Sequence, residues 1–226
     1  MSKLKVEFFH DAVCGWCYVL SPRLRNFLEK FDVEIEQKCF VLQRNDQEMI
    51  NNFGSLAEAK DEILKHWKSC QMSADDPSTI NISGMREKSF SYPSGFLAAL
   101  GAKAAELMGG SDTHWDYFDQ IQHLHLKVNE NIGDRDIVIF AAEKIGLNKE
   151  KFIQLLDSEK VKNEVNKDIE RSKNLGIRTI PSLVINREKV ISQTLSNEEL
   201  ESLFKSYMTP DNSCLLYTSP SPRDRG

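Results

Sequence analysis

The feature that most restricts how this chain can fold is a closely spaced cysteine pair, Cys14 and Cys17, placed where strand character gives way to helix character. Residues 4–9 are rich in β-branched and aromatic side chains, which predicts a short β-strand. From Cys17 to about Lys30 apolar residues recur on one face at helical spacing, which predicts an amphipathic helix. Residues 10–13 make the turn between the two. Both thiols are therefore expected at the N-terminus of a helix.

This position has a chemical consequence for the two thiols. The free amide groups of a helix N-terminus favour negative charge, so they stabilise a thiolate on Cys14, which we expect to be the exposed nucleophile. Cys17 lies one helical turn further in, close enough to attack a mixed disulfide on Cys14 and release the product. The pattern points to thiol–disulfide exchange, a reaction that needs neither a metal nor an organic cofactor.

A Cys-X-X-Cys pair can also be half of a zinc site, or simply two buried structural thiols. A zinc site needs further Cys or His ligands, typically a second closely spaced pair. Cys39 and Cys70 are isolated, and His123 and His125 are too close along a helix to share a face well. Redox chemistry is therefore favoured and metal ligation is not expected. Cys39 and Cys70 are expected to be small buried apolar residues.

Composition limits the class of protein. Of the 226 residues 40% are hydrophobic and 28% are charged, as in soluble globular proteins. The net charge of −5, from 34 acidic and 29 basic residues, argues against a nucleic-acid binder. No apolar run approaches the ~20 residues that span a bilayer, and the first residues lack a signal-peptide pattern. We therefore expect a cytoplasmic protein without a membrane partner, and the odd number of cysteines does not suggest a disulfide framework.

The rest of the chain begins with a strand and continues into a helical middle. Residues 33–41 alternate apolar and polar side chains, which predicts a second strand. Between residues 55 and 175 no segment has convincing strand character. Residues 75–94 are polar, contain proline and glycine, and are expected to form a loop. Helices are expected at residues 56–70, 96–108, 113–128, 134–145, 149–157 and 159–175, with an apolar core-facing stripe of Phe118, Ile121, Leu124 and Val128.

After Gly176 the chain returns to strand character. Residues 182–185 and 189–192 flank a turn and predict a hairpin. Ser196 opens a final helix with a capping-box pattern. Pro181 stands directly before the first strand of the hairpin, where, taken alone, it could be a trans proline at the start of an edge strand.

Two segments carry a resemblance to a known family. Residues 9–18 read Phe-His-Asp-Ala-Val-Cys-Gly-Trp-Cys-Tyr and resemble the opening of DsbA-like proteins of the FrnE type, which commonly read Asp-x-x-Cys-Pro-Trp-Cys-Tyr. Residues 175–185 resemble the family's cis-proline segment, and the long helical stretch matches its helical insertion. The resemblance covers about residues 4–208. It implies an α/β thioredoxin fold with a large all-helical insertion, in which Cys14 attacks a disulfide and Cys17 resolves the mixed disulfide.

The resemblance also implies supporting roles for other residues. Pro181 is expected to be cis and to pack against the sulfurs beside Ile180, and Trp16 to shield the disulfide and contact substrate. Asp11 matches a family aspartate that could accept a proton from Cys17 through water, although it could equally be a turn residue. Gly15 departs from the family pattern, where proline is usual. His10 is expected to pack at the strand end, and the implied partners are protein disulfides or small thiols such as glutathione.

The expected organisation has four segments. Residues 1–54 and 176–210 form the two halves of the thioredoxin fold, and residues 55–175 form the helical insertion. The tail, residues 211–226 with Cys214, has no period and ends in a Ser/Pro/Arg mixture, so it is expected to be disordered and artefactual.

Two other functions stay open at the level of sequence. One is a glutathione-dependent isomerase or transferase related to the kappa class, in which a serine replaces the nucleophilic cysteine. The other is a non-enzymatic holdase or binding module that uses the helical insertion as an apolar platform. The presence of both Cys14 and Cys17 favours the oxidoreductase over these alternatives.

Overall fold

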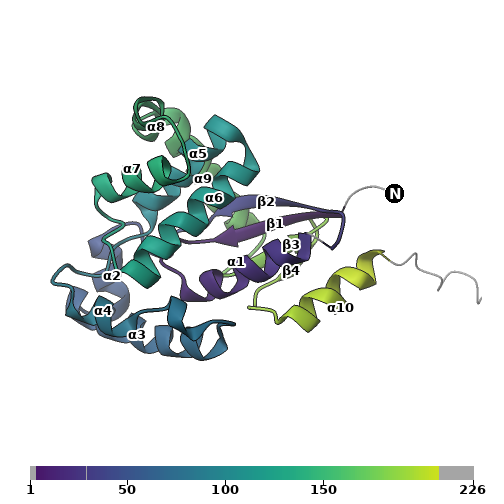
Figure 1. Ribbon diagram of the computed structural model, residues 1–226, viewed down its shortest axis with the longest axis horizontal. Coiled ribbons are helices and arrows are strands. Elements are labelled where there is room, and N and C mark those ends of the chain that lie inside the picture. Colours follow the sequence, from purple (N-terminus) through teal and green to yellow (C-terminus); the bar gives the residue numbers. More distant parts are fainter. Residues whose placement is uncertain (1–3, 29, 209–226) are drawn as a thin grey trace, which may run out of the picture.

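Figure 1 shows the computed structural model, which describes residues 4–28 and 30–208. The expected tail and Cys214 lie outside these residues. Four strands form one sheet in the order β2-β1-β3-β4. β1 and β2 are parallel, and the other two pairs are antiparallel. The strands are β1 (Leu4–His10), β2 (Val33–Cys39), β3 (Ser182–Ile185) and β4 (Lys189–Ile191).

One face of the sheet is covered by α1 (Gly15–Leu28) and α10 (Asn197–Met208). The predicted apolar face of α1 accounts for this, because Leu20, Leu24 and Phe27 are buried in the same cluster as sheet residues. The ring of Phe27 stacks on that of Phe204 in α10, with 4.6 Å between centroids. The helix that opens the fold and the helix that closes it therefore share one core.

The remaining helices lie between β2 and β3 in the chain and have a large apolar core of their own. In Figure 1 they gather at the end of the sheet where β1 stops. None of the described helices is long and apolar enough to cross a membrane. They are α2 (Asp46–Phe53), α3 (Leu56–Ser73), α4 (Ile82–Glu87), α5 (Phe96–Gly109), α6 (Ser111–Gln122), α7 (Arg135–Lys144), α8 (Lys149–Leu156) and α9 (Glu159–Asn174), with a 3₁₀ turn at Pro77–Thr79 and a π-helix at His123–Val128.

The strand order, the parallel β1–α1–β2 unit and the closing β3–β4 hairpin followed by α10 make a thioredoxin fold. The helices between β2 and β3 form the large insertion. The expected fold class is therefore confirmed.

Two short helices were not expected. Residues 75–94 are not a plain loop, because they contain the 3₁₀ turn and α4, and α2 precedes residue 55. Side-chain caps explain both helices. Asn45 accepts a hydrogen bond from the amide of Glu48 at the start of α2, and Asn81 accepts one from Gly84 in α4. Such short elements have too little apolar periodicity to stand out in the sequence.

The segment at residues 113–128 is not one regular α-helix. α6 ends at Gln122 and the chain continues as the π-helix, which Asn129 closes with a left-handed φ of 64°. The wider turn changes which side chains face inward. Leu126 is fully buried, whereas Val128, expected in the core stripe, is 43% exposed. The other three members of the stripe are buried as predicted.

Candidate active site

The cysteine motif lies at the carboxyl end of β1, where α1 begins. Cys14 immediately precedes α1 and its backbone carbonyl accepts from the amide of Tyr18 at 3.2 Å. The amide of Cys17 points at the sulfur of Cys14, with 3.3 Å between N and Sγ. The Cys14 side chain thus caps α1: its sulfur accepts a hydrogen bond from one of the backbone amides that a helix leaves without a partner at its N-terminus.

The two sulfurs differ in burial. Cys17 is fully buried, and burial together with the neighbouring Cys14 raises its pKa well above the ordinary value. Cys17 is therefore a protonated thiol at neutral pH. Cys14 is only 7% exposed, so the expectation of an exposed Cys14 is wrong. One group that covers it is the carbonyl of Ile180, which lies 3.8 Å from its sulfur.

Pairing of β1 with β3 brings the proline segment to the motif. Phe9 is opposite Ser182 in the antiparallel ladder, so the residues before Ser182 lie beside the turn that follows β1. The peptide bond between Ile180 and Pro181 is cis. Ser182 fixes this segment, because its hydroxyl donates to the carbonyl of Thr179 at 2.7 Å.

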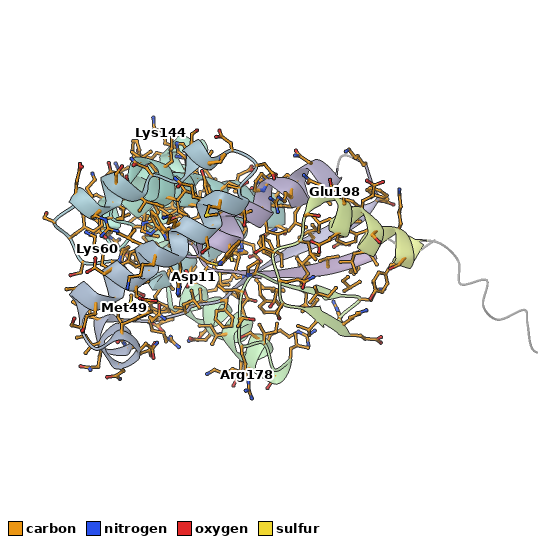
Figure 2. The ribbon with its side chains drawn as sticks, turned by 90° about the horizontal axis from the view of Figure 1, so that it is seen from below. Asp11, Met49, Lys60, Lys144, Arg178 and Glu198 are labelled. Carbon is orange, nitrogen blue, oxygen red and sulfur yellow. The ribbon has the colours of Figure 1, made fainter. Side chains whose placement is uncertain are left out.

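Asp11 is buried in the turn that leads to Cys14. One carboxylate oxygen accepts from the amide of Val13 at 3.2 Å, and the other accepts from Leu42 at 2.8 Å. Burial raises the pKa of Asp11 to about 6. Figure 2 places Asp11 near the middle of the molecule, where the helices meet the strands. Asp11 is thus a turn residue, and its charge also contributes to the raised pKa of Cys17.

Trp16 lies between the two halves of the fold. Its partly buried side chain packs against both the sheet core and the helical core. The chain crosses between the two cores at this point, since Val13 belongs to the helical core while Cys14 and Cys17 belong to the sheet core. The cysteine pair therefore stands at the junction of the thioredoxin fold with its insertion.

Residues 11–14 form the active-site turn. Their backbone also accepts hydrogen bonds from side chains that were not identified as candidates from the sequence. The amide nitrogen of Gln122 lies 3.1–3.4 Å from three carbonyl oxygens of the turn, and the hydroxyl of Tyr92 donates to the fourth at 2.9 Å. Cys70 reaches the motif as well, because its sulfur packs against Gly15. Nothing local in the sequence marks these residues, since their contacts depend on how α3, α6 and the loop before α5 pack.

The other residues considered from sequence have packing roles. His10 is buried with its ring centroid 3.7 Å from that of Phe118, and burial lowers the pKa of His10, so it is neutral. Cys39 and Cys70 are each 1% exposed, as predicted. Burial raises the pKa of both, that of Cys70 to about 12. Within the described residues there is no group of three or more His, Cys, Asp or Glu side chains that could hold a metal ion.

A cavity of about 480 Å³ lies next to the motif along α1. It begins at Tyr18, the residue after Cys17, and its far wall is the segment from Ala74 to Thr79. This volume lies in the range of small-ligand pockets. Asp75, Asp76 and Asp119 line it together with Arg25, so acidic side chains outnumber basic ones among these charged groups.

Known structures share this architecture. A candidate protein disulfide isomerase from Nitrosomonas europaea matches with a TM-score of 0.76 at 18% identity, over 92% of this chain and 98% of that one. The cytosolic disulfide reductase DsbM from Pseudomonas aeruginosa matches with a TM-score of 0.72 at 15% identity, over 90% and 98%, and its structure with GSH matches with the same TM-score. At these identities the likeness shows the fold.

The family follows from the sequence. No curated protein sequence gives a significant match. The model of the DSBA-like thioredoxin domain, in contrast, matches residues 5–205, which include both cysteines of the motif and the proline segment. The chain belongs to the family of DSBA-like thioredoxin domains, which confirms the disulfide oxidoreductase class expected from its sequence.

Proposed function

We propose that Cys14 is the nucleophile and Cys17 the resolving thiol of this oxidoreductase. The Cys14 thiolate attacks one sulfur of a substrate disulfide, which forms a Cys14–substrate disulfide and expels the other sulfur as a thiolate. Cys17 then loses its proton and attacks the Cys14 sulfur. This releases the second substrate thiolate and leaves a Cys14–Cys17 disulfide. The substrate gains two electrons and the protein loses two, and the reverse sequence oxidises a dithiol.

The observation that carries this assignment is the contact between the Cys17 amide and the Cys14 sulfur at 3.3 Å. An amide that donates to sulfur at a helix N-terminus stabilises the thiolate on Cys14. Cys17 is fully buried with a raised pKa, so it holds its proton until the mixed disulfide has formed. The two thiols thus differ in the way that attack and resolution require.

Four neighbouring residues support these steps in our proposal. The carbonyl of Ile180, 3.8 Å from the Cys14 sulfur, and the adjoining Pro181 position the incoming disulfide. Trp16 covers the junction beside the motif and contacts the substrate. Asp11 accepts the proton of Cys17 through water during resolution. Support for this last role comes from its buried carboxyl group, whose pKa of about 6 suits proton exchange near neutral pH.

We further propose that the protein is of the FrnE type, acts in the cytoplasm, and exchanges electrons with small thiols such as glutathione. The motif spacing and the helical insertion support the subtype. The cytosolic neighbour DsbM, which has been solved with GSH, supports the compartment and the thiol. The cavity beside Tyr18 would receive the residues that flank the substrate disulfide.

Reduction of insulin by glutathione tests the proposal. The wild type is expected to accelerate the reaction, Cys14→Ser to abolish the acceleration, and Cys17→Ser to accumulate mixed disulfides that reductant removes. Cys39→Ser is the matched control, because Cys39 is equally buried but belongs to the end of β2. Equal activity of all four proteins would disprove the assignment.

The same variants separate the alternatives. A glutathione-dependent isomerase or transferase of the kappa-related type does not need a second thiol, so Cys17→Ser would keep full activity on its substrate. A holdase would suppress aggregation of unfolded proteins equally well without Cys14 and Cys17. Trapped mixed disulfides in Cys17→Ser alone are expected only for the oxidoreductase.

A further inference from the structure

One side chain of the insertion contacts most of the active-site turn. The amide nitrogen of Gln122, at the end of α6, lies 3.1 Å from the carbonyl oxygen of Cys14, 3.3 Å from that of Asp11 and 3.4 Å from that of Ala12. Gln122 is fully buried. Tyr92 donates to the remaining carbonyl, that of Val13. The amide group of Gln122 shares two hydrogens among three carbonyls, and two of these also accept from backbone amides, Asp11 from Cys14 and Cys14 from Tyr18.

These contacts determine how the turn presents the sulfur. A peptide unit is planar, so a carbonyl held in one direction fixes the orientation of the whole unit. Holding the units on both sides of Cys14 fixes the direction of its Cα–Cβ bond. That direction in turn sets the 3.3 Å contact between the Cys14 sulfur and the Cys17 amide. Donors that lie outside the thioredoxin fold thus help to orient Cys14, together with the backbone bonds of the turn and of α1.

Gln122 differs from Gln37, another buried glutamine, in the contacts of its amide nitrogen. That of Gln122 lies against the turn, whereas neither polar side-chain atom of Gln37 has a hydrogen-bond partner among the described residues. The side-chain oxygen of Gln122 is buried and has no hydrogen-bond partner among the described residues. An unpartnered buried acceptor destabilises a protein, and an apolar side chain of the same length would avoid this. The π-helix also begins at the next residue, and such segments are frequent at functional sites.

We propose that Gln122 is a positioning residue that orients the active-site turn so that the helix amide stabilises the Cys14 thiolate. This proposal rests on the proposed exchange chemistry at Cys14. It makes the insertion part of the machinery that sets the reactivity of the motif.

Two substitutions that keep the length of the side chain test the proposal. Gln122→Met removes both donors, and Gln122→Glu replaces them with an acceptor that repels the carbonyls. Gln37→Met and Gln37→Glu are matched controls, because Gln37 is also a buried glutamine but lies in β2 opposite Phe8 and makes no hydrogen bond to the turn. The readouts are the alkylation rate of reduced Cys14 and the equilibrium of the Cys14–Cys17 pair with glutathione.

We expect Gln122→Met to slow alkylation of Cys14 about three- to tenfold, as expected for loss of one or two hydrogen bonds. A less stable thiolate favours the disulfide, so the equilibrium with glutathione should shift by the same factor, and tenfold corresponds to about 30 mV more negative. Gln122→Glu should slow alkylation further. Both Gln37 variants should keep the wild-type rate and equilibrium, whatever they do to the melting temperature.

Wild-type values in both Gln122 variants would overturn the proposal, and so would equal shifts in the Gln122 and Gln37 variants. Alkylation needs no substrate. A wild type that failed to reduce insulin would therefore contradict the proposed function, whereas the effect of Gln122 on Cys14 would still be measured.

Discussion

The sulfur of Cys70 occupies the space that a side chain at position 15 would need. A Cβ atom built on Gly15 would lie 2.9 Å from Cys70 Sγ, closer than packed atoms approach, and 3.3 Å from Cys70 Cβ, a tight contact. Cys70 lies in α3, so a helix of the insertion restricts which residue fits between the two motif cysteines. This contact favours glycine at position 15, because every other residue, proline included, carries a Cβ atom.

This contact predicts that substitutions at positions 15 and 70 are coupled. Gly15→Ala should lower the free energy of unfolding by about 1–3 kcal/mol through overpacking. In a Cys70→Ala background, where the sulfur is gone, the same substitution should cost less than about 1 kcal/mol. A Cys39→Ala background is the control, because Cys39 is buried elsewhere and should leave the cost unchanged. Urea denaturation measures the effect of Gly15→Ala in the wild-type, Cys70→Ala and Cys39→Ala backgrounds. An equal loss of unfolding free energy in all three would refute the steric coupling.

The unequal environments of the motif thiols predict an order of alkylation. At slightly acidic pH, reduced Cys14 should react with iodoacetamide at least about tenfold faster than Cys17, because only Cys14 receives a helix amide on its sulfur. Cys39 and Cys70 should also react slowly, since burial raises the pKa of both. A Cys214→Ser background removes the fifth thiol from the measurement. Mass spectrometry of labelled peptides gives the order, and uniform labelling would contradict it.

The sequence predicted the parts of the site that are local. The strand before Cys14, the helix that starts after it and the proline before β3 each follow from a few neighbouring residues. Gln122 could not be found in this way. It lies two residues from the partly exposed Gln120 in the same helix, and only the packing of α6 against the turn distinguishes the two. The π-helix was missed for a related reason, because an apolar pattern read at 3.6 residues per turn assumes a regular helix.

Burial of Asp11 predicts a dependence of stability on pH. Its pKa is about 6 in the folded protein against an ordinary value of 3.8. The folded state therefore binds this proton more tightly than the unfolded state does. The resulting stabilisation is fully present below about pH 4 and is lost as the pH rises through 6, and its full size is about 3 kcal/mol.

Asp11→Asn cannot titrate, so the stability advantage of the wild type over this variant should shrink by up to about 3 kcal/mol between pH 4 and pH 7. Taking this difference cancels the titration of other groups. Asp112 is exposed on α6, and Asp112→Asn should change the corresponding difference by less than about 0.5 kcal/mol. Urea denaturation across this pH range gives both values. A constant difference for Asp11→Asn would show that Asp11 titrates alike in the two states.

The last prediction concerns Tyr92, whose hydroxyl lies within hydrogen-bond distance of three buried polar groups. It donates to the carbonyl of Val13 at 2.9 Å and accepts from Nε1 of Trp67 at 3.2 Å. Nε2 of His125 lies 3.0 Å from the same oxygen. Tyr92→Phe would leave these three buried groups without a partner.

We therefore expect Tyr92→Phe to lower the free energy of unfolding by about 2–3 kcal/mol. It should also slow alkylation of Cys14, because Val13 is the residue before it and its carbonyl would lose its donor. Tyr117→Phe is a close control, since Tyr117 is equally buried and donates to a carbonyl within the insertion, that of Val138, at 3.2 Å. Tyr117→Phe should lower the free energy of unfolding by about 1–2 kcal/mol, yet keep wild-type reactivity at Cys14. If both variants altered that reactivity equally, general loosening of the insertion would explain the effect, and the hydrogen bond to Val13 would have no separate role.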